Sequence, residues 1–134
     1  MMNLTEEMLL ELFNEKAPIA GCFGMKLSYD DKDRANIALS YNPDLDHAGG
    51  GVHGGVIATL LDNAGWFTCA MCCNSMLLTS EISVHFLRPA VKTGLRAQGE
   101  MLKKSRHQAV AQMHCWDEAE ALVAHGTGTF SFVA

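Results

Sequence analysis

Residues 53–73, HGGVIATLLDNAGWFTCAMCC, decide the architecture of this chain. After the two glycines the stretch is apolar almost throughout, lacks the alternation of a strand and is too long to be one. It therefore predicts a helix of about 18–20 residues, roughly 30 Å long. Because this helix is apolar on nearly every side, we expect it to be buried on most sides. Asp62 and Asn63 near its middle argue against a membrane span.

The sequence around this helix predicts an antiparallel sheet. Before the helix, residues 35–41 alternate between apolar and polar side chains. After it come four strand-like segments separated by turn signals, at 78–87, 94–104, 107–116 and 120–133. Consecutive strands joined by short turns are largely antiparallel. The result is an α+β fold in which one sheet packs on one long helix.

The beginning of the chain predicts a shorter helix. Asn3 or Thr5 is a suitable cap, and acidic residues follow in the first turn, where the helix dipole favours them. The helix is expected to end at Lys16, because the residue before Pro18 disfavours the helical conformation. With 134 residues and no linker-like stretch, we expect a single domain over 1–134.

Composition narrows the classes of partner. The net charge of −5 and the lack of a long basic run exclude general binding to nucleic acid or to an anionic membrane. The five cysteines are odd in number, and three of them fall within one apolar segment, so we expect reduced, buried thiols. The N-terminal residues do not have the pattern of a signal peptide. We expect a cytoplasmic protein.

A single sheet cannot cover a helix that is apolar all round. The remaining face of the helix is therefore predicted to meet a second copy of the chain.

Several motifs resemble hot-dog thioesterases of the PaaI-like (phenylacetic acid degradation) group. In that group a loop is followed by His-Gly-Gly at the start of the central helix and by Asp nine residues after the His, as at His53 and Asp62. Thr79, ten residues before Pro89, and the last strand AHGTGTFSFV also match. The resemblance covers about residues 20–133. It implies a hot-dog fold, a curled antiparallel sheet around a central helix with a short N-terminal helix, and acyl-CoA thioesterase activity without a cofactor.

Thioester hydrolysis needs an N–H donor for the developing oxyanion and a carboxylate that activates water or attacks directly. The first turn of a helix has unpaired N–H groups, and Gly54 there allows a close approach to the backbone. We therefore predict the Gly54 N–H as the oxyanion donor and Asp62 as general base or nucleophile. His53 shapes the turn or contacts the substrate. The resemblance implies that Thr79 positions water beside Asp62.

The distance between these two groups predicts a shared site. Asp62 lies eight residues after Gly54, about 12 Å along the helix axis. Both groups must come within about 3 Å of one thioester, which a single helix cannot achieve. Two antiparallel central helices from paired subunits can. We expect a homodimer or a dimer of dimers, as the resemblance also implies.

Substrate contacts are predicted on both sides of the thioester. The loop side is expected to use Gly55 and His47, where the group usually has Asn. The coenzyme A phosphates are assigned to basic residues near strand ends, and the acyl tunnel to apolar positions of the helix. These residues are Arg88, Lys104 and Arg106 for the phosphates, and Leu60, Leu61, Trp66 and Phe67 for the tunnel.

Other interpretations remain open. Asp62 could pair with a buried polar group, and Gly54 and Gly55 could serve only close packing. His47, His53 and the nearby aspartates match no metal-ligand spacing, so no metal site is predicted. The chain could also be a non-catalytic acyl-CoA binder or regulator, which His47 favours, or a hot-dog hydratase, whose motifs are not visible. The acyl group is left open among aryl-acetyl, hydroxybenzoyl and medium-chain fatty acyl groups.

Overall fold

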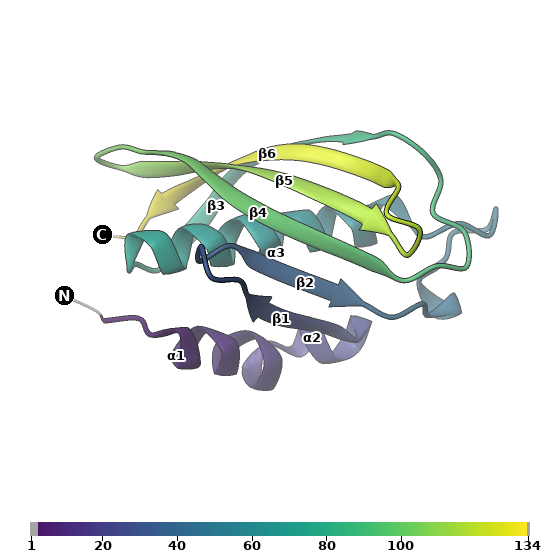
Figure 1. The fold of residues 1–134 in the computed structure, drawn as a ribbon, viewed down its shortest axis with the longest axis horizontal. Coiled ribbons are helices and arrows are strands. Elements are labelled where there is room, and N and C mark those ends of the chain that lie inside the picture. The colour runs from purple at the N-terminus through teal and green to yellow at the C-terminus, as the bar shows by residue number, and fades with distance from the viewer. Residues whose placement is uncertain (1–2, 134) are drawn as a thin grey trace.

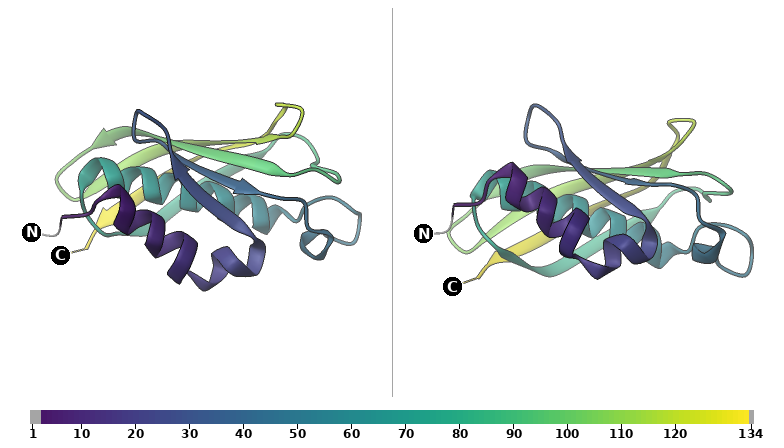
Figure 2. Two further views of the ribbon diagram at one scale, coloured as in Figure 1. Left: turned by 60° about the horizontal axis from the view of Figure 1, so that its bottom comes forward. Right: turned by 90° about the horizontal axis from the view of Figure 1, so that it is seen from below.

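The structure is a computed structural model that describes residues 3–133. One antiparallel sheet curls over the long helix α3, and a segment of short N-terminal helices lies beside α3 and the sheet edge (Figures 1 and 2). Both ends of the described chain lie near the C-terminal end of α3 (Figure 1). The predicted α+β hot-dog architecture is confirmed.

The sheet contains six strands in the order β1-β2-β4-β5-β6-β3, and all neighbours are antiparallel. β3 pairs only with β6, so its other edge has no partner among residues 3–133. The predicted strands are confirmed with ends shifted by a few residues. Their bounds are β1 Met25–Tyr29, β2 Ala35–Leu39, β3 Leu77–Phe86, β4 Leu95–Lys104, β5 Gln108–Asp117 and β6 Leu122–Phe132.

Helix α3 spans Gly54–Cys73, in agreement with the prediction, and one side of it packs tightly on the sheet. A Cβ at Gly99 of β4 would lie 2.3 Å from the Ala64 carbonyl oxygen, so only glycine permits this approach. The buried Thr68 hydroxyl donates to the same carbonyl at 2.7 Å and accepts the Ala35 N–H at 3.0 Å. These contacts join α3 to β4 and β2.

The opposite side of α3 is less covered. Its partly exposed residues form a stripe at helical spacing that consists of Ala58, Thr59, Asp62, Asn63 and Trp66. By length and composition α3 could cross a membrane, but 56% of its apolar window is buried in this fold. The helix is the central element of the core, and burial on most sides is confirmed except along this stripe and at the two ends of the helix.

The N-terminal segment differs from the prediction. Helix α1 (Glu6–Glu11) begins after Thr5, whose hydroxyl accepts the Met8 N–H at 3.1 Å, and continues as a π-helical turn, η1 (Leu12–Lys16). The chain then starts a second helix, α2 (Pro18–Phe23), because proline is favoured at a first helical position. The turn η1, α2 and the strand β1 were not predicted.

The cysteines correct a further expectation. Cys69 and Cys115 are buried and Cys73 is half-buried, whereas Cys22 and Cys72 are exposed. All five are free thiols, but burial was the wrong expectation for two of them.

Candidate active site

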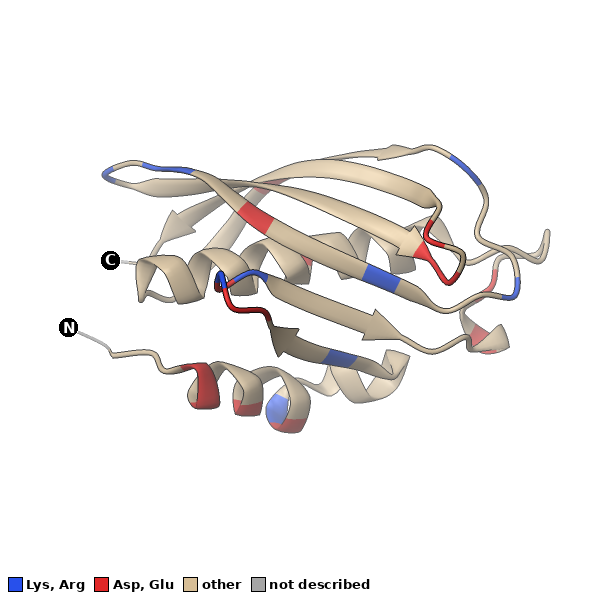
Figure 3. Ribbon diagram, in the orientation of Figure 1, with Lys and Arg blue, Asp and Glu red and all other residues tan. Residues whose placement is uncertain are grey.

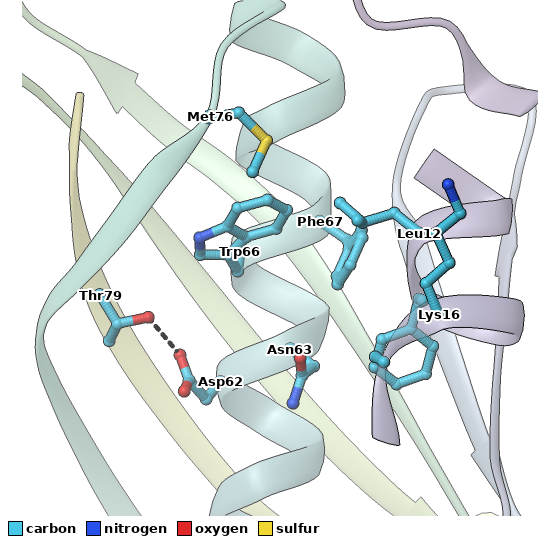
Figure 4. Close-up of a pocket in the computed structure, with 10 residues that line it drawn as sticks. Leu12, Lys16, Asp62, Asn63, Trp66, Phe67, Met76 and Thr79 are labelled. Carbon is cyan, nitrogen blue, oxygen red and sulfur yellow. Dashed lines mark hydrogen bonds between the residues drawn. The ribbon is translucent and has the colours of Figure 1, made fainter. Parts of the chain in front are cut away.

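Asp62 and Thr79 form a direct pair on the open side of α3. The Thr79 hydroxyl, at the start of β3, donates a hydrogen bond of 2.8 Å to the Asp62 Oδ1 atom (Figure 4). The bond joins residues seventeen positions apart, and a bulge in the β3–β6 register lies just after Thr79. The other carboxylate oxygen, Oδ2, accepts no hydrogen bond from residues 3–133. It is therefore available to a water molecule or a substrate.

The surroundings of Asp62 favour its protonated form. Burial raises the pKa of the Asp62 carboxyl above its usual 3.8. The hydrogen bond from Thr79 has the opposite but smaller effect on this pKa, so the net shift is upward. Among the described residues Asp62 forms no ion pair. A carboxylate with a raised pKa is a stronger base than an ordinary surface aspartate.

A cavity of about 370 Å³ opens beside this pair. Apart from Asp62, Thr79, Asn63 and the stem of Lys16, its walls are apolar (Figure 4). The Trp66 indole is held in the wall by a hydrogen bond of 2.8 Å from its Nε1–H to the Leu77 carbonyl. The apolar lining consists of Leu12, Phe13, Ala17, Trp66, Phe67 and Met76.

This cavity corrects the predicted tunnel in part. Trp66 and Phe67 line it as expected, but Leu60 and Leu61 are fully buried in the core and face the sheet side of α3. Sequence analysis missed the N-terminal wall. Leu12 and Phe13 showed helical spacing, which signals a buried face but does not identify the element that it meets.

The start of α3 presents a free backbone donor. The His53 side chain caps the helix, and its Nδ1 atom accepts the Gly55 N–H at 2.9 Å. With Nδ1 accepting this hydrogen bond, the N–H of the ring lies at Nε2. The Gly54 N–H has no acceptor within residues 3–133. The ring of Phe86 lies 3.4 Å from the position that a Gly54 Cβ would occupy.

The loop before α3 is closed on itself around His47. The His47 N–H donates to the Gly51 carbonyl at 2.8 Å, and the ring Nδ1 accepts the Gly49 N–H at 2.9 Å. A Cβ at Gly49 would lie only 2.9 Å from the imidazole, so the glycines leave room for this ring. Histidine, in place of the usual asparagine, therefore orders the loop through its own ring nitrogen.

The Gly54 turn and the Asp62 pair open to different cavities in one protomer. A second space, of about 390 Å³, is lined by His47, Gly54, Phe86 and Arg88 among others, and it shares no lining residue with the Asp62 cavity. The carboxylate and the free amide thus lie at two separate cavities.

The sequence signature of the thioesterase superfamily matches residues 49–124, more than half of the chain. The chain belongs to the thioesterase superfamily. This match contains His53, Gly54, Asp62 and Thr79, so the family resemblance drawn from these residues is confirmed.

Relatives of this thioesterase-superfamily chain include the medium/long-chain acyl-CoA thioesterase YigI of Escherichia coli K12. It is 27% identical and aligns over 95% of this chain and 96% of its own. The solved Haemophilus influenzae thioesterase HI1161 has the same fold, with a TM-score of 0.85, 20% identity and coverage of 98% and 92%. The Escherichia coli PaaI protein, from the phenylacetic acid degradation operon, also does, with a TM-score of 0.84, 19% identity and coverage of 90% and 88%.

The basic residues predicted to bind coenzyme A lie in two separate places in this thioesterase-superfamily chain. Arg88 lines the Gly54 cavity, whereas Lys104 ends β4 and Arg106 lies in the β4–β5 turn. Positive charge is visible on both loops, at opposite ends of the sheet (Figure 3). Lys104 lies 5.9 Å from the centre of the Phe132 ring. One protomer therefore does not gather the three residues into one cluster.

The described part of this thioesterase-superfamily chain contains no group of three or more His, Cys, Asp or Glu side chains arranged to hold a metal ion.

Proposed function

We propose that this protein hydrolyses an acyl-CoA thioester to a free carboxylic acid and coenzyme A. The observation that carries the proposal is the Asp62–Thr79 pair at the end of an apolar cavity, with one carboxylate oxygen left free. The family of the chain supports thioester hydrolysis as the reaction class, and the name of its relative YigI supports an acyl-CoA substrate.

Asp62 performs the central step, either as a base that deprotonates water or as a nucleophile that attacks the thioester carbonyl. Its raised pKa suits both roles, because burial makes the Asp62 carboxylate a stronger base than an ordinary aspartate. The Thr79 hydroxyl fixes Oδ1 and so directs Oδ2 at the water or the carbonyl carbon. If Asp62 is the base, water adds to the carbonyl, the carbon–sulfur bond breaks, and the proton taken from water passes to the departing thiolate. If Asp62 is the nucleophile, loss of the thiolate leaves an anhydride on Asp62, and water then hydrolyses it to the free acid and supplies the proton for the thiolate.

The Gly54 N–H stabilises the negative charge that develops on the carbonyl oxygen. It is suited to this task because it has no protein acceptor and lies at the positive end of the long helix α3. The Nε2–H of His53 is a second polar group at the same turn for the substrate.

Each active site consists of the Asp62 half-site of one copy and the Gly54 half-site of another. The eight-residue separation, about 12 Å along α3, prevents one chain from supplying both groups. Three features support pairing along this side: the free edge of β3, the partly exposed stripe on α3 and the exposed Phe86 beside Gly54. Antiparallel α3 helices bring the start of one near the middle of the other.

Coenzyme A phosphates are assigned first to Arg88, because it lines the cavity of the oxyanion donor. Lys104 and Arg106 lie at the opposite end of the sheet from Arg88, so a second copy of the chain must supply them if they bind the same coenzyme A.

Release of thiol from a panel of acyl-CoAs tests the activity. The wild-type protein is expected to turn over at least one member, and Asp62→Asn to lose that turnover while it remains folded. Asp31→Asn, the same substitution at an exposed aspartate that lines neither cavity, is the matched control and should keep the rate. Tight binding of acyl-CoA without thiol release would instead indicate the non-catalytic binder.

Sharing of the site is tested by mixing two inactive variants. Asp62→Asn and Gly54→Pro are co-expressed with different tags, and the mixed oligomer is purified through both. A mixed dimer would have one intact site of two, so the doubly purified sample should regain about half of the wild-type activity. A mixed sample as inactive as its parents would contradict sharing.

A further inference from the structure

The Asp62 cavity does not end at the N-terminal segment. A second cavity, of about 210 Å³, lies between that segment and the end of α3. The two cavities share three lining residues, Leu12, Lys16 and Met76. These residues therefore form the partition between a proximal space next to the carboxylate and a distal space farther from it.

The distal space has the chemistry of a site for an aliphatic chain. Its lining is apolar except for Glu11 and Lys16, and the apolar residues are Leu4, Met8, Leu9, Leu12 and Met76. The Lys16 ammonium lies 3.7 Å from Glu11, and both side chains are mostly exposed. The two charges thus lie at the surface and leave the interior apolar, where a methylene chain gains free energy by leaving water.

The direction of the groove fits an acyl chain attached at Asp62. From Asp62 to Trp66 the proximal space follows α3 for about 6 Å towards its C-terminal end. Met76, just after the helix, forms part of the far wall of this space and also faces the distal one. In Figure 4 the lining side chains lead from Asp62 past Trp66 to Met76 on one side and Leu12 on the other.

The N-terminal segment is held firmly enough to act as a wall. At one end the Leu4 N–H donates to the Asn74 side chain at the end of α3. At the other end Asn14 exchanges two hydrogen bonds with the Leu27 backbone of β1, of 3.0 and 2.8 Å. Between them Phe13 packs edge-on against Phe67, with the ring centres 5.1 Å apart.

The π-helical turn explains how one short segment both binds β1 and lines the cavity on α3. The wider turn over Leu12–Lys16 directs the Asn14 amide to β1 while Leu12, Phe13 and Lys16 line the cavity on α3. π-helical turns are rare and are often found at functional sites.

We propose that the N-terminal segment is the distal part of the acyl-binding groove, and that Leu12 and Met76 set the length of the acyl chain. The ligand class is a straight saturated acyl group whose tail lies against or passes this partition. This inference rests on the proposed thioesterase function, because it takes the Asp62 end as the position of the thioester.

The test measures kcat/KM for saturated acyl-CoAs from butanoyl to hexadecanoyl, with phenylacetyl-CoA and hydroxybenzoyl-CoA added. Leu12→Ala joins the two cavities and should move the optimum to longer chains, with a gain of about tenfold for the longest relative to the shortest. Leu12→Trp closes the partition and should move the optimum to shorter chains. Met76→Ala should act in the direction of Leu12→Ala.

Leu10→Ala is the matched control. Leu10 lies in α1 two residues before Leu12, has the same side chain and is partly buried, but it lines neither cavity. The control should lower stability without moving the chain-length optimum. Three outcomes would overturn the inference. The chain-length optimum shifts equally in both leucine variants, it shifts in neither, or the aromatic thioesters are turned over faster than every straight-chain one.

Failure of the proposed function is distinguished by a binding measurement. If no substrate releases thiol, binding can still be followed through Trp66, because its side chain lines the groove. The Trp116→Phe substitution leaves Trp66 as the sole tryptophan, so that fluorescence reports on the groove alone. Titration with saturated fatty acids of increasing length should then change Trp66 fluorescence, with a length dependence that Leu12→Ala shifts upward. Fluorescence that is unchanged at every length would refute the groove itself.

Discussion

The two sides of helix α3 differ in how completely other residues cover them. On the sheet side, Gly99 brings β4 close to the Ala64 carbonyl, and the buried Thr68 hydroxyl links that carbonyl to the Ala35 N–H of β2. On the open side, Asp62 is only partly buried and its carboxyl is held by one hydrogen bond. Close packing leaves no space for a ligand, whereas an incompletely covered carboxylate has unused capacity for one. Changes on the open side should therefore alter rate, and changes on the packed side should alter stability.

The largest effect is expected for Asp62→Asn. The amide cannot accept a proton or attack the carbonyl, so kcat should fall about 10²–10⁴-fold. The folded state, with its raised pKa, binds the Asp62 proton more tightly than the unfolded state does. Stability of the wild type therefore falls as pH rises from the usual 3.8 through the raised folded pKa.

The same variant consequently makes a prediction about stability. Asp62→Asn removes this contribution to the fall with pH and should be at least as stable as the wild type at neutral pH. Denaturant unfolding at several pH values measures it. If Asp62→Asn strongly destabilised the protein, the carboxylate would support the fold, as expected if Asp62 served only to pair with a buried polar group.

Gly54→Pro should have the next largest effect. Proline at a first helical position removes only an N–H that forms no internal hydrogen bond, and His53, with ψ of 135°, already has the conformation favoured before proline. Loss of an oxyanion donor should lower kcat about 10²–10³-fold with the fold retained. Gly54→Ala keeps the N–H and is the control. Its Cβ meets the Phe86 ring at an ordinary contact distance. If Gly54→Pro and Gly54→Ala had similar rates, the Gly54 N–H would have no part in the mechanism.

Gly99→Ala tests the packed side. Its Cβ would lie 2.3 Å from the Ala64 carbonyl oxygen, so β4 or α3 must move, at a cost of about 1–3 kcal/mol in the free energy of unfolding. Gly21→Ala, where a Cβ meets no atom within 4 Å, is the control and should be neutral or slightly stabilising. The kcat of folded Gly99→Ala protein should be close to that of the wild type. Loss of rate without loss of stability would break the division between the two sides.

Thr79→Val should have the smallest effect. It removes the hydrogen bond that lowers the pKa of Asp62, so the acidic limb of the rate profile should move to higher pH. The rate at neutral pH should fall about two- to tenfold, which corresponds to about 0.5–1.4 kcal/mol, the net contribution of a typical hydrogen bond. Thr79→Ser retains the hydroxyl and should retain the profile. An unchanged profile in Thr79→Val would show that the pair has no part in tuning the carboxylate.

Much of this fold could be predicted because its signals are local. The bounds of α3 follow from two glycines before an apolar run, and the later strands follow from alternation between turn residues. The beginning of the chain was predicted less well. Pro18 was interpreted as the end of a helix, although it also starts the next one, and a π-helical turn has no distinct pattern in a short sequence.

The candidate site divides in the same way. The separation of Gly54 and Asp62 along the helix is a property of the sequence, and it predicts two half-sites without any coordinates. The proximity of Thr79 to Asp62 was implied only by resemblance, because nothing local relates residues seventeen positions apart, and their direct hydrogen bond is seen only in the structure. The burial of Leu60 and Leu61, and their absence from the cavity, required the orientation of α3 on the sheet.

By itself, the sequence determined that a long apolar helix with one acid would lie on an antiparallel sheet, because periodicity and composition act within a few residues. Only the tertiary structure decided which side of that helix is closed by Gly99 and which remains open at Asp62, and that Leu12 forms a wall opposite Trp66. Those outcomes depend on contacts between distant segments, whose energies are set by shape and distance in space.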